Sequence, residues 1–513
     1  MKRNKITAFC TALTLLAGSL TALPVSAEDT VMRGDVDVSG EVNVADAVKL
    51  ARYNAEDKEV HVTEQGLLNA DMNLDGRANA DDSAILLEVL AGLASVPESF
   101  SSQNLMSGIT ANPAKGTVTD EAFRQSQLAL ALNLLRTNCT EEQNAGKNVM
   151  VSPLSVAIAL AMTANGAKGT ALSEMEQVIG GGISIAQLND YYAYWLSRIN
   201  AEKGDEKKLY AADAIWFRDN DDLIQVPEKF LQTCADYYGA DAYKAPFDKS
   251  TVNDINNWCK TNTHDMIEKV IDELSPDCTM VLANALAFEA EWSIPYDDYQ
   301  VHDHDFTLED GTKKTVQMMS SGEYTYLEDA GAIGFEKYYE GGNYSFAAIL
   351  PPEGKTVDEY IASLDAKGLQ ALLDSRTTEY DVYADLPKFK FDFGNSLKKS
   401  LKQLGMPTSF NDGEEPADFT GLNNAPGMDT WIGDVIHKTF IDLSETGTKA
   451  AAVTVVMMET GCAMEEPPVI KYVTLDRPFV FMILDKSVDL PVFIGAVKNI
   501  GENAPAADTA DIH

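Results

Sequence analysis

The chain has 513 residues, more than one domain usually holds, and 45% of them are apolar, so we expect most of the chain to fold around a substantial core. The formal net charge is −39, from 79 acidic and 40 basic side chains. Such a surface repels phosphate groups and anionic lipids, which excludes nucleic acid and membrane surfaces as expected partners.

The first 27 residues have the pattern of a secretory signal peptide. The basic residues Lys2, Arg3 and Lys5 precede a mostly apolar run over 6–23, and small residues follow up to Ala27. No later run approaches the roughly 18 apolar residues that a membrane span needs. We therefore expect a secreted, extracellular protein whose signal peptide is 1–27.

The cysteines do not suggest a disulfide framework. Five remain after the signal peptide, an odd number at wide spacings. We expect free buried thiols at Cys139, Cys234, Cys259 and Cys278, whereas the neighbours of Cys462 are typical of an exposed loop.

Residues 28–93 contain a repeat in which oxygen-bearing side chains recur at loop positions 1, 3, 5, 9 and 12. They are Asp35, Asp37, Ser39, Asn43 and Asp46 in the first copy, and Asp71, Asn73, Asp75, Asn79 and Asp82 in the second. Position 6 is glycine in both, Gly40 and Gly76. Ca²⁺ takes about 6–8 oxygen ligands around such a tight turn. Because five donors and the glycine recur in register, two calcium sites are favoured over two ordinary polar turns.

One amphipathic run follows each loop, ending near Tyr53 and Leu90, and no entering helix is expected before either loop. This arrangement resembles the dockerin module of bacterial cellulosomes. The resemblance implies a small all-α domain with two loop-helix repeats that binds two Ca²⁺ ions and attaches the protein to a cohesin on a scaffold protein. It implies cohesin contacts at loop positions 10 and 11, which are Val44 and Ala45 in one copy and Ala80 and Asp81 in the other. The two pairs differ, which disfavours a symmetric dual binding mode.

Residues 94–119 are rich in Ser, Pro, Gly and Asn and are predicted to form a linker. A large domain is expected over 120–500, followed by a disordered polar tail over 501–513. Apolar spacing predicts helices over 123–135 and 153–164, and apolar runs predict strands over 280–287, 344–350, 479–484 and 492–497. Helices and strands that do not alternate strictly indicate an α+β fold.

No arrangement of residues in the large domain indicates catalysis. The chain has only six histidines, and it contains no nucleophile elbow, no zinc-binding helix motif and no phosphate-binding loop. His302 and His304 could bind a metal, but a third ligand is not evident, so we interpret them as part of an exposed loop.

The segment 444–468 is unusual in its side chains. After Gly447 come small or β-branched residues, and alternate positions of a strand share one face. The face that carries Thr448, Ala450, Ala452 and Thr454 is uncharged as far as Met458. Residues 459–468 have the composition of an exposed loop. This segment by itself fits an ordinary strand and loop as well as a specialised one.

Motifs elsewhere in the domain distinguish the two interpretations. They read, in chain order, NVMVSPLS (148–155), ANGAKGT (164–170), INNW (255–258), LANA (282–285), LPP (350–352), LPKF (386–389), ADFTG (417–421), HKTF (437–440), RPF (477–479) and FIG (493–495). Their order and spacing over roughly 120–500 are similar to those of the serpins, a family of serine protease inhibitors. The resemblance implies helices with three β-sheets and an exposed reactive loop.

The serpin resemblance also implies a mechanism. A target protease cleaves the reactive loop and is held as an acyl-enzyme while the loop inserts into the large sheet; loop insertion in serpins is an established case of strand addition. Matching positions are the hinge residues Glu445, Gly447, Thr448, Ala450, Ala451, Ala452 and Thr454, a buried polar shutter of Ser152, Ser155, Asn284 and His437, and the breach residue Trp292. Val453 is bulkier than the family's usual residue, which would slow insertion.

Counting from Glu445 as the family does places the scissile bond at Gly461–Cys462, with Thr460–Gly461 and Cys462–Ala463 as alternatives. No Lys or Arg lies between Ala450 and Ile470, which disfavours trypsin-like targets. Elastase-like or subtilisin-like serine proteases are favoured, and papain-like cysteine proteases stay open. We expect a monomer that forms a covalent protease complex and needs no cofactor in this domain.

Two other functions remain open. A non-inhibitory serpin would act as a carrier or structural protein, but such members usually have charged or bulky hinge residues. An extracellular enzyme attached to a scaffold would need a catalytic arrangement that the sequence lacks.

Overall fold

The computed structural model describes residues 32–500 apart from 56, 59, 73–77, 92–101, 202–207, 220–223, 265, 268, 276–277, 426–428 and 449–468. The chain forms two compact units, Met1–Phe100 and Ser101–His513. Among the described residues, no helix is both long enough and apolar enough to cross a membrane.

The first unit is built from the helices α2 (Val44–Asn54), α3 (Glu64–Ala70) and α4 (Ala80–Leu90). Asn43 caps α2 by accepting the backbone N–H of Ala45, and it forms a capping box with Asp46. Among the described residues of this unit, the buried core is small and consists of Val36, Ala47, Leu50, Ala70, Met72 and Leu86. Because so little apolar surface is buried, a bound ion would add substantially to the stability of this unit.

Both predicted runs after the calcium loops are helical, as α2 and α4. The expectation that no helix precedes a loop is wrong for the second copy, because α3 ends at Ala70, directly before Asp71. Thr63 caps α3 by accepting the backbone N–H of Gly66, which is a local signal that the sequence already contained.

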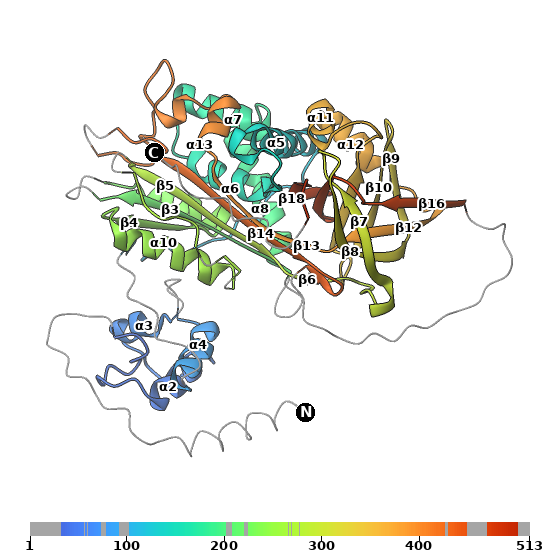
Figure 1. The fold of residues 1–513 in the computed structure, drawn as a ribbon. Coiled ribbons are helices and arrows are strands. Elements are labelled where there is room, and N and C mark those ends of the chain that lie inside the picture. Colours follow the sequence, from blue (N-terminus) through green and yellow to red (C-terminus); the bar gives the residue numbers. More distant parts are fainter. Residues whose placement is uncertain are drawn as a thin grey trace. The chain divides into compact units, whose positions relative to one another are not determined.

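The second unit contains three β-sheets (Figure 1). The large sheet has the order β1-β4-β3-β5-β14-β15-β6, with β13 paired to β14. Its strands are β1 (Gln103–Asn104), β4 (Asp241–Ala245), β3 (Leu209–Arg218), β5 (Met280–Phe288), β14 (Asp434–Leu443), β15 (Gly447–Thr448), β6 (Ala290–Glu291) and β13 (Phe389–Ser396).

The other two sheets are smaller. The six-stranded sheet contains, in order, β2 (Val149–Val151), β18 (Leu490–Val497), β17 (Phe479–Asp485), β11 (Tyr344–Leu350), β10 (Ala332–Tyr338) and β9 (Thr325–Asp329). The four-stranded sheet contains β16 (Val469–Thr474), β12 (Tyr380–Pro387), β8 (Lys313–Glu323) and β7 (Val301–Thr307). The strands β11, β17 and β18 are buried along their whole length, which explains their continuous apolar runs.

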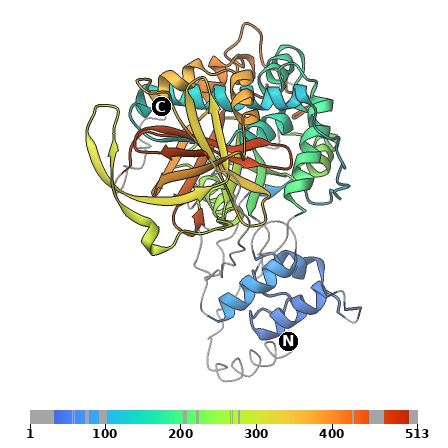
Figure 2. The ribbon, with the colours of Figure 1, turned by 90° about the vertical axis from the view of Figure 1, so that its right-hand side faces the viewer.

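Helices cover the sheets. They are α5 (Glu121–Thr140), α6 (Pro153–Ala164), α7 (Gly169–Gly180), α8 (Ile185–Ile199), α9 (Glu228–Thr233), the π-helix η3 (Cys234–Tyr238), α10 (Lys249–Asn262), α11 (Val357–Ser363), α12 (Ala366–Asp374) and α13 (Lys398–Gln403), with short 3₁₀ turns η1 (Glu142–Asn144), η4 (Asp298–Gln300) and η5 (Thr408–Phe410). The helices coloured cyan to teal gather above the strands in both views (Figures 1 and 2). Every residue of α6 is buried, so this helix lies inside the unit.

The predicted elements agree with these bounds. The helix predicted over 153–164 is α6, and the strands predicted over 280–287, 344–350, 479–484 and 492–497 are β5, β11, β17 and β18. The α+β class with three sheets is therefore confirmed.

Part of the predicted linker belongs to the second unit instead. Within 102–119, β1 pairs with β4, and the Ser102 hydroxyl donates a hydrogen bond of 2.6 Å to Asp254. Gly116 lies so close to the backbone of Tyr194 that an added Cβ would approach its nitrogen to 2.2 Å. Composition indicated a linker because the segment is polar, but its backbone groups are hydrogen-bonded to the large domain.

His302 and His304 also differ from expectation. They lie on β7, at the edge of the four-stranded sheet, and not in a loop. Their rings are 6.2 Å apart, and within the part of the chain that the structure describes β7 pairs with β8 alone. Solvent exposure of His302, Asp303 and Asp305 explains why the composition of this strand is that of a loop.

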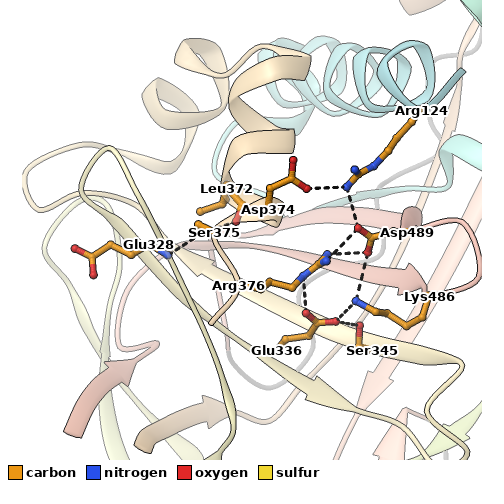
Figure 3. Close-up of polar contacts among 10 residues, drawn as sticks. All are labelled: Arg124, Glu328, Glu336, Ser345, Leu372, Asp374, Ser375, Arg376, Lys486 and Asp489. Carbon is orange, nitrogen blue, oxygen red and sulfur yellow. Dashed lines mark hydrogen bonds and ion pairs between the residues drawn. The ribbon is translucent and has the colours of Figure 1, made fainter. Parts of the chain in front are cut away.

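A network of ion pairs joins helices to the six-stranded sheet (Figure 3). Glu336 on β10 has a fully buried side chain and lies 2.7 Å from both Arg376 and Lys486. Arg376 also donates two hydrogen bonds to Asp489, which accepts a further one of 2.8 Å from Arg124 on α5. Burial alone would raise the pKa of Asp489, but these cations hold it below its usual range. The network fixes the turn between β17 and β18 against α5.

Candidate functional site

The strands β14 and β5 separate partway along the large sheet. They are parallel and pair at Asp434 with Val281, Val435 with Leu282, and Ile436 with Ala283. No ladder pairing between them is present beyond Ile436 in the described residues. The next residue on each strand is His437 and Asn284, two of the predicted shutter residues.

The strand β15 occupies the far end of this separation. Thr448 pairs with Leu443 on β14 and with Ala290 on β6, antiparallel to both. Leu443 follows Ile436 by the same number of residues as Ala290 follows Ala283. Leu443 and Ala290 would therefore be paired if the ladder between the two strands had continued to them. The segment after β14 has therefore already entered the sheet by two residues.

Gly447 is required for this entry. A Cβ added there would lie 2.1 Å from the Ala290 carbonyl oxygen and 2.7 Å from the Glu291 Cα atom, and the backbone φ of +154° is one that other residues rarely adopt. The backbone of β6 thus approaches β15 more closely than any side chain would allow. This close approach is the physical reason for a glycine at the predicted hinge position 447.

Trp292, the predicted breach residue, lies beside β15. Its ring stacks on Tyr339 with centroids 4.4 Å apart, and its Nε1 donates a hydrogen bond of 3.0 Å to the Ser444 carbonyl. Its backbone N–H donates to the carbonyl of Thr446 at 2.9 Å. The Tyr339 hydroxyl lies 2.7 Å from the Thr448 hydroxyl. Sequence reasoning missed Tyr339, whose burial against Trp292 is visible only in the fold.

Glu445 is tied to the sheet by Lys388, whose ammonium group lies 2.6 Å from its carboxylate. Burial alone would raise the pKa of Glu445, but the hydrogen bond and charge of Lys388 hold it below its usual range. Both side chains are about one-third exposed, so water screens the pair. The contact positions the start of the segment and contributes little to stability.

The four predicted shutter residues meet under the large sheet. The Ser152 backbone N–H donates to His437 Nε2 at 3.0 Å, and the Ser155 hydroxyl donates to Asn284 Oδ1. Ser152 is the N-cap of α6, where its hydroxyl accepts the Ser155 N–H at 3.2 Å and donates to the Val492 carbonyl at 2.8 Å. The N-terminus of α6 thus bridges β14 and β5 at the point where they separate.

Asp213 extends this cluster and was not predicted. It faces Asn284 across the β3–β5 ladder and accepts a hydrogen bond from the Asn284 amide. Burial raises its pKa to about 7. A single carboxylate within the apolar strand Leu209–Arg218 was a signal that could have identified it. Burial also lowers the pKa of His437 to about 4, so its imidazole is neutral and can accept the Ser152 N–H.

The remaining hinge and loop predictions lie outside the described residues. They are Ala450, Ala451, Ala452 and Thr454, and the scissile-bond candidates Thr460, Gly461, Cys462 and Ala463.

The first calcium loop brings its carboxylates together. Oxygens of Asp35, Asp37 and Asp46 all lie within 4.8 Å of one another, and Asp35 and Asp46 are buried. Asp35 accepts the backbone N–H groups of Ser39 and Gly40 at 2.8 and 2.7 Å. Gly40 has φ +86°, as the tight turn requires. Burial, together with the charges of the neighbouring carboxylates, raises the pKa of Asp46. Carboxylates gathered this closely repel one another, so the donor set fits a bound Ca²⁺ ion.

The described part of the second loop repeats this geometry. Asp82 accepts the Asn79 backbone N–H at 2.7 Å, as Asp46 accepts that of Asn43 at 2.8 Å. Asp71 lies directly after α3, and the candidate ligands Asn73 and Asp75 lie outside the described residues.

The predicted cohesin-contact residues begin the two helices. Val44 and Ala45 are exposed at the start of α2, and Ala80 is exposed at the start of α4. Asp81 follows on α4, but the description does not extend to its side chain.

The prediction of free buried thiols at Cys139, Cys234, Cys259 and Cys278 is confirmed. Burial raises the pKa of Cys139 and Cys259 to about 12 and that of Cys278 to about 11, so these thiols are unreactive at neutral pH. Cys462 lies outside the described residues.

Comparison with protein families gives two matches. The model of the family "Serpin (serine protease inhibitor)" matches residues 125–500, and the model "Dockerin type I domain" matches residues 33–90. An uncharacterised serpin-like protein of Thermococcus kodakarensis is 30% identical over 69% of this chain and 80% of its own length. Iripin-2 of Ixodes ricinus is also 30% identical, over 69% of this chain and 88% of its own length.

Solved structures show the same fold. The native state of Tengpin, a thermophilic serpin, is 40% identical and has a TM-score of 0.71, covering 78% of this chain and all of that one. The latent state of Tengpin has a TM-score of 0.64 at 38% identity, covering 75% of this chain and all of that one. The present structure is thus more similar to the native form than to the latent form.

Proposed function

This chain belongs to the serpin family of serine protease inhibitors and carries a type I dockerin domain, and on that premise we propose that it traps proteases by insertion of its own loop. In this proposal the segment after Thr448 is cleaved by the protease and then continues β15 down the separation between β14 and β5. The observation that carries the proposal is the register of β15.

If the loop inserts in the register of β15, a position follows for each inserting residue. Each further residue of the loop would pair one position earlier on both β14 and β5. Ala452 would then lie between Thr439 and Leu286, both buried, and Thr454 would lie between His437 and Asn284 in the shutter. In-register neighbours share a face, so the uncharged face of the loop would point into the core.

Insertion releases free energy only if the backbone N–H and C=O groups of the new strand form hydrogen bonds with the neighbouring strands. A dozen ladder hydrogen bonds at about 1 kcal/mol net each would contribute on the order of 10 kcal/mol. Beyond Thr454 the strand must replace the three β14–β5 pairs at Asp434, Val435 and Ile436. The shutter therefore lies at the last point that the loop reaches before existing pairs must break.

The residues around the proposed scissile bond predict the class of target protease. We place the scissile bond at Gly461–Cys462 and expect elastase-like or subtilisin-like serine proteases as targets, with papain-like cysteine proteases as a further class. No basic residue lies between Ala450 and Ile470. The buried carboxylate of a trypsin-like specificity pocket would therefore stay unpaired when this loop is bound.

The experiment is a denaturing gel of the full chain mixed with subtilisin, pancreatic elastase or trypsin. A covalent band with subtilisin or elastase but not with trypsin is expected. A non-inhibitory serpin would give cleavage or no reaction, without the band. A covalent band with trypsin alone would contradict the target assignment.

Two neighbouring substitutions make the test specific for insertion. Ala452→Glu would bury an unpaired charge between Thr439 and Leu286, so the loop should be cleaved without a covalent band. In Val453→Glu the same charge would lie on the other face beside half-buried Lys438, and the band should persist. Equal behaviour of the two variants would contradict the proposed register.

We further propose that residues 1–27 direct secretion and that the dockerin domain attaches the protein to an extracellular cellulosome scaffold in the presence of Ca²⁺. Val44 and Val48 are 44% and 52% exposed on one face of α2, whereas the equivalent face of α4 presents the smaller Ala80 and Ala84. We therefore expect α2 to make the larger contact with a cohesin.

Binding of the full chain to a type I cohesin domain tests this second module. Binding should require Ca²⁺ and should be lost in EDTA. Val44→Asp should weaken it at least tenfold, and the matched Ala80→Asp should have a smaller effect. Calcium-independent binding would contradict the assignment.

A further inference from the structure

Two histidines on β7, at the edge of the four-stranded sheet, are used neither by loop insertion nor by the dockerin domain (Figure 1). His302 and His304 are two residues apart on one strand, so their side chains lie on the same face. Their ring centroids are 6.2 Å apart. His302 is exposed and His304 is half-buried. The two imidazoles are thus neighbours at the surface.

The strand holds this pair in place. β7 pairs with β8, with His302 opposite Met318 and His304 opposite Val316. Met318 and Val316 are buried, so a regular ladder anchors the two histidines at the edge of the core. A loop would lose backbone freedom on binding a ligand, whereas a paired strand has already lost it. The strand therefore supplies the order that a site of two exposed side chains needs.

The ring nitrogens of the pair are available to a ligand. Among the described residues, no hydrogen bond or ion pair occupies a nitrogen of either ring. Alternation along the strand places the neighbouring Asp303 and Asp305 on the opposite face. There Asp303 accepts a hydrogen bond from Gln317, and Asp305 lies 3.3 Å from Lys313. The face with the two rings therefore offers imidazole nitrogens to a ligand, and the adjacent carboxylates have other partners.

The distance between the rings allows one metal ion to reach both. A metal–nitrogen bond is about 2.1 Å long and an imidazole nitrogen lies about 1.1 Å from its ring centre, so each centroid lies about 3.2 Å from a bound ion. Two rings that share an ion therefore have centroids at most about 6.4 Å apart, and about 5.2 Å apart at a tetrahedral angle. The observed 6.2 Å lies within this limit. A side-chain adjustment of about 1 Å, at the exposed His302, reaches the tetrahedral value.

We propose that His302 and His304 chelate a divalent transition-metal ion, with Cu²⁺ bound more tightly than Ni²⁺ or Zn²⁺. Imidazole nitrogen suits all three ions, and a given set of donors binds Cu²⁺ most tightly among them. The other coordination positions of the ion would be filled by water, which an exposed strand edge admits. The net charge of −39 attracts cations to the surface. Ca²⁺ prefers oxygen ligands and should not compete for this site.

The experiment is isothermal titration calorimetry of the full chain with Cu²⁺ and with Zn²⁺, in excess Ca²⁺ so that the carboxylate loops of the first unit are filled. His302→Gln and His304→Gln should each weaken binding of one Cu²⁺ ion per chain about tenfold or more, because a single imidazole cannot chelate. The matched control His61→Gln removes an exposed histidine of the first unit and should leave this binding unchanged. Binding should weaken as the pH falls below about 6, because an imidazole must be neutral to bind a metal ion.

A second variant separates chelation from the mere number of histidines. Asp303→His combined with His304→Gln keeps two histidines on β7 but places them on opposite faces of the strand. It should bind Cu²⁺ as weakly as His304→Gln alone. The electron paramagnetic resonance spectrum of the Cu²⁺-loaded unmodified protein should show nitrogen splitting from two imidazoles, and this pattern should be absent from all three variants of β7. Thermal melting verifies that the variants are folded.

Several results would overturn the proposal. Unchanged Cu²⁺ affinity in His302→Gln and His304→Gln would do so, and so would tight binding by the variant with histidines on opposite faces. Half an ion per chain, with a dimer on size-exclusion chromatography, would place the ion between two copies and refute a site within one chain. Metal binding and covalent capture of a protease are measured separately, so failure of the proposed function would leave this inference standing.

Discussion

We predict that Asp213 makes the stability of the native state depend on pH. Its carboxyl group is buried beneath the large sheet and accepts a hydrogen bond from Asn284. Burial raises its pKa from the usual 3.8 to about 7. The folded protein therefore binds the proton more tightly than the unfolded chain, and this contribution to stability is complete below pH 4 and is lost as the pH rises through 7.

The size of this effect follows from the pKa difference. A difference of about 3 between the folded and unfolded pKa corresponds to about 4 kcal/mol of lost stability above pH 8. Asp213→Asn keeps the side-chain shape and an oxygen that can accept from the Asn284 amide, but it cannot ionise. We expect the variant to be more stable than the unmodified protein by about 4 kcal/mol at pH 8.5 and by only about 1 kcal/mol at pH 4.5.

His437 makes the comparison with a variant necessary. Its pKa is lowered from 6.5 to about 4, so it contributes stability above pH 6.5 that is lost as the pH falls towards 4. The unmodified protein thus loses stability at both ends of the range. Because His437 is present in both proteins, its contribution cancels in the difference between them.

The assay is urea unfolding followed by fluorescence at several pH values from 4.5 to 8.5. The free energy of unfolding of Asp213→Asn minus that of the unmodified protein should grow by about 3 kcal/mol across this range. Asp381→Asn, at an exposed position on β12, is the control and should show no such trend. A difference that stays constant with pH would refute the reasoning.

Three further predictions follow from close contacts. Gly447→Val should displace β15 from Ala290, so that elastase cleaves the loop with a severalfold higher stoichiometry of inhibition on gels; an unchanged stoichiometry would show that β15 entry is dispensable. Arg376→Met should lower the free energy of urea unfolding by about 3–5 kcal/mol, because Glu336 stays buried with one cation fewer, and a loss below 1 kcal/mol would mean that the site relaxes. Addition of Ca²⁺ should raise the melting temperature of the first unit in the full chain, and Asp35→Ala should abolish most of that rise, whereas an identical rise in the variant would place the ion elsewhere.

The local elements could be predicted because their causes are local. Strands buried on both faces, such as β5 and β17, require continuous apolar runs, and α6 begins at a Ser-Pro pair that caps a helix. The first calcium loop was predictable for the same reason, since its donors lie within 12 residues of one another. The observed grouping of Asp35, Asp37 and Asp46 agrees with the spacing of oxygen donors in the sequence.

The predictions from sequence were wrong where solvent exposure or a distant hydrogen-bonding partner determines the local structure. Residues 102–119 have the composition of a linker, but β4 and α8 supply partners for their backbone. His302 and His304 are polar like loop residues, but they lie on β7, a strand at the edge of the four-stranded sheet. The sequence does not show which polar segments pair with another strand. For residues 102–119 the pairing strand, β4, is more than 100 residues away along the chain.

The sequence by itself determined the family, the two modules and the uncharged face of the reactive loop, because motif order and side-chain alternation are properties of the chain. Only the tertiary structure decided the register of β15 and the partner of Asp213. Asp213 and its partner Asn284 lie beneath one sheet with Ser152 and His437, although Ser152, Asn284 and His437 are each more than 130 residues from the next along the chain. Burial and hydrogen bonding act through distances in space, and so the pKa of Asp213 could not be inferred before the fold was known.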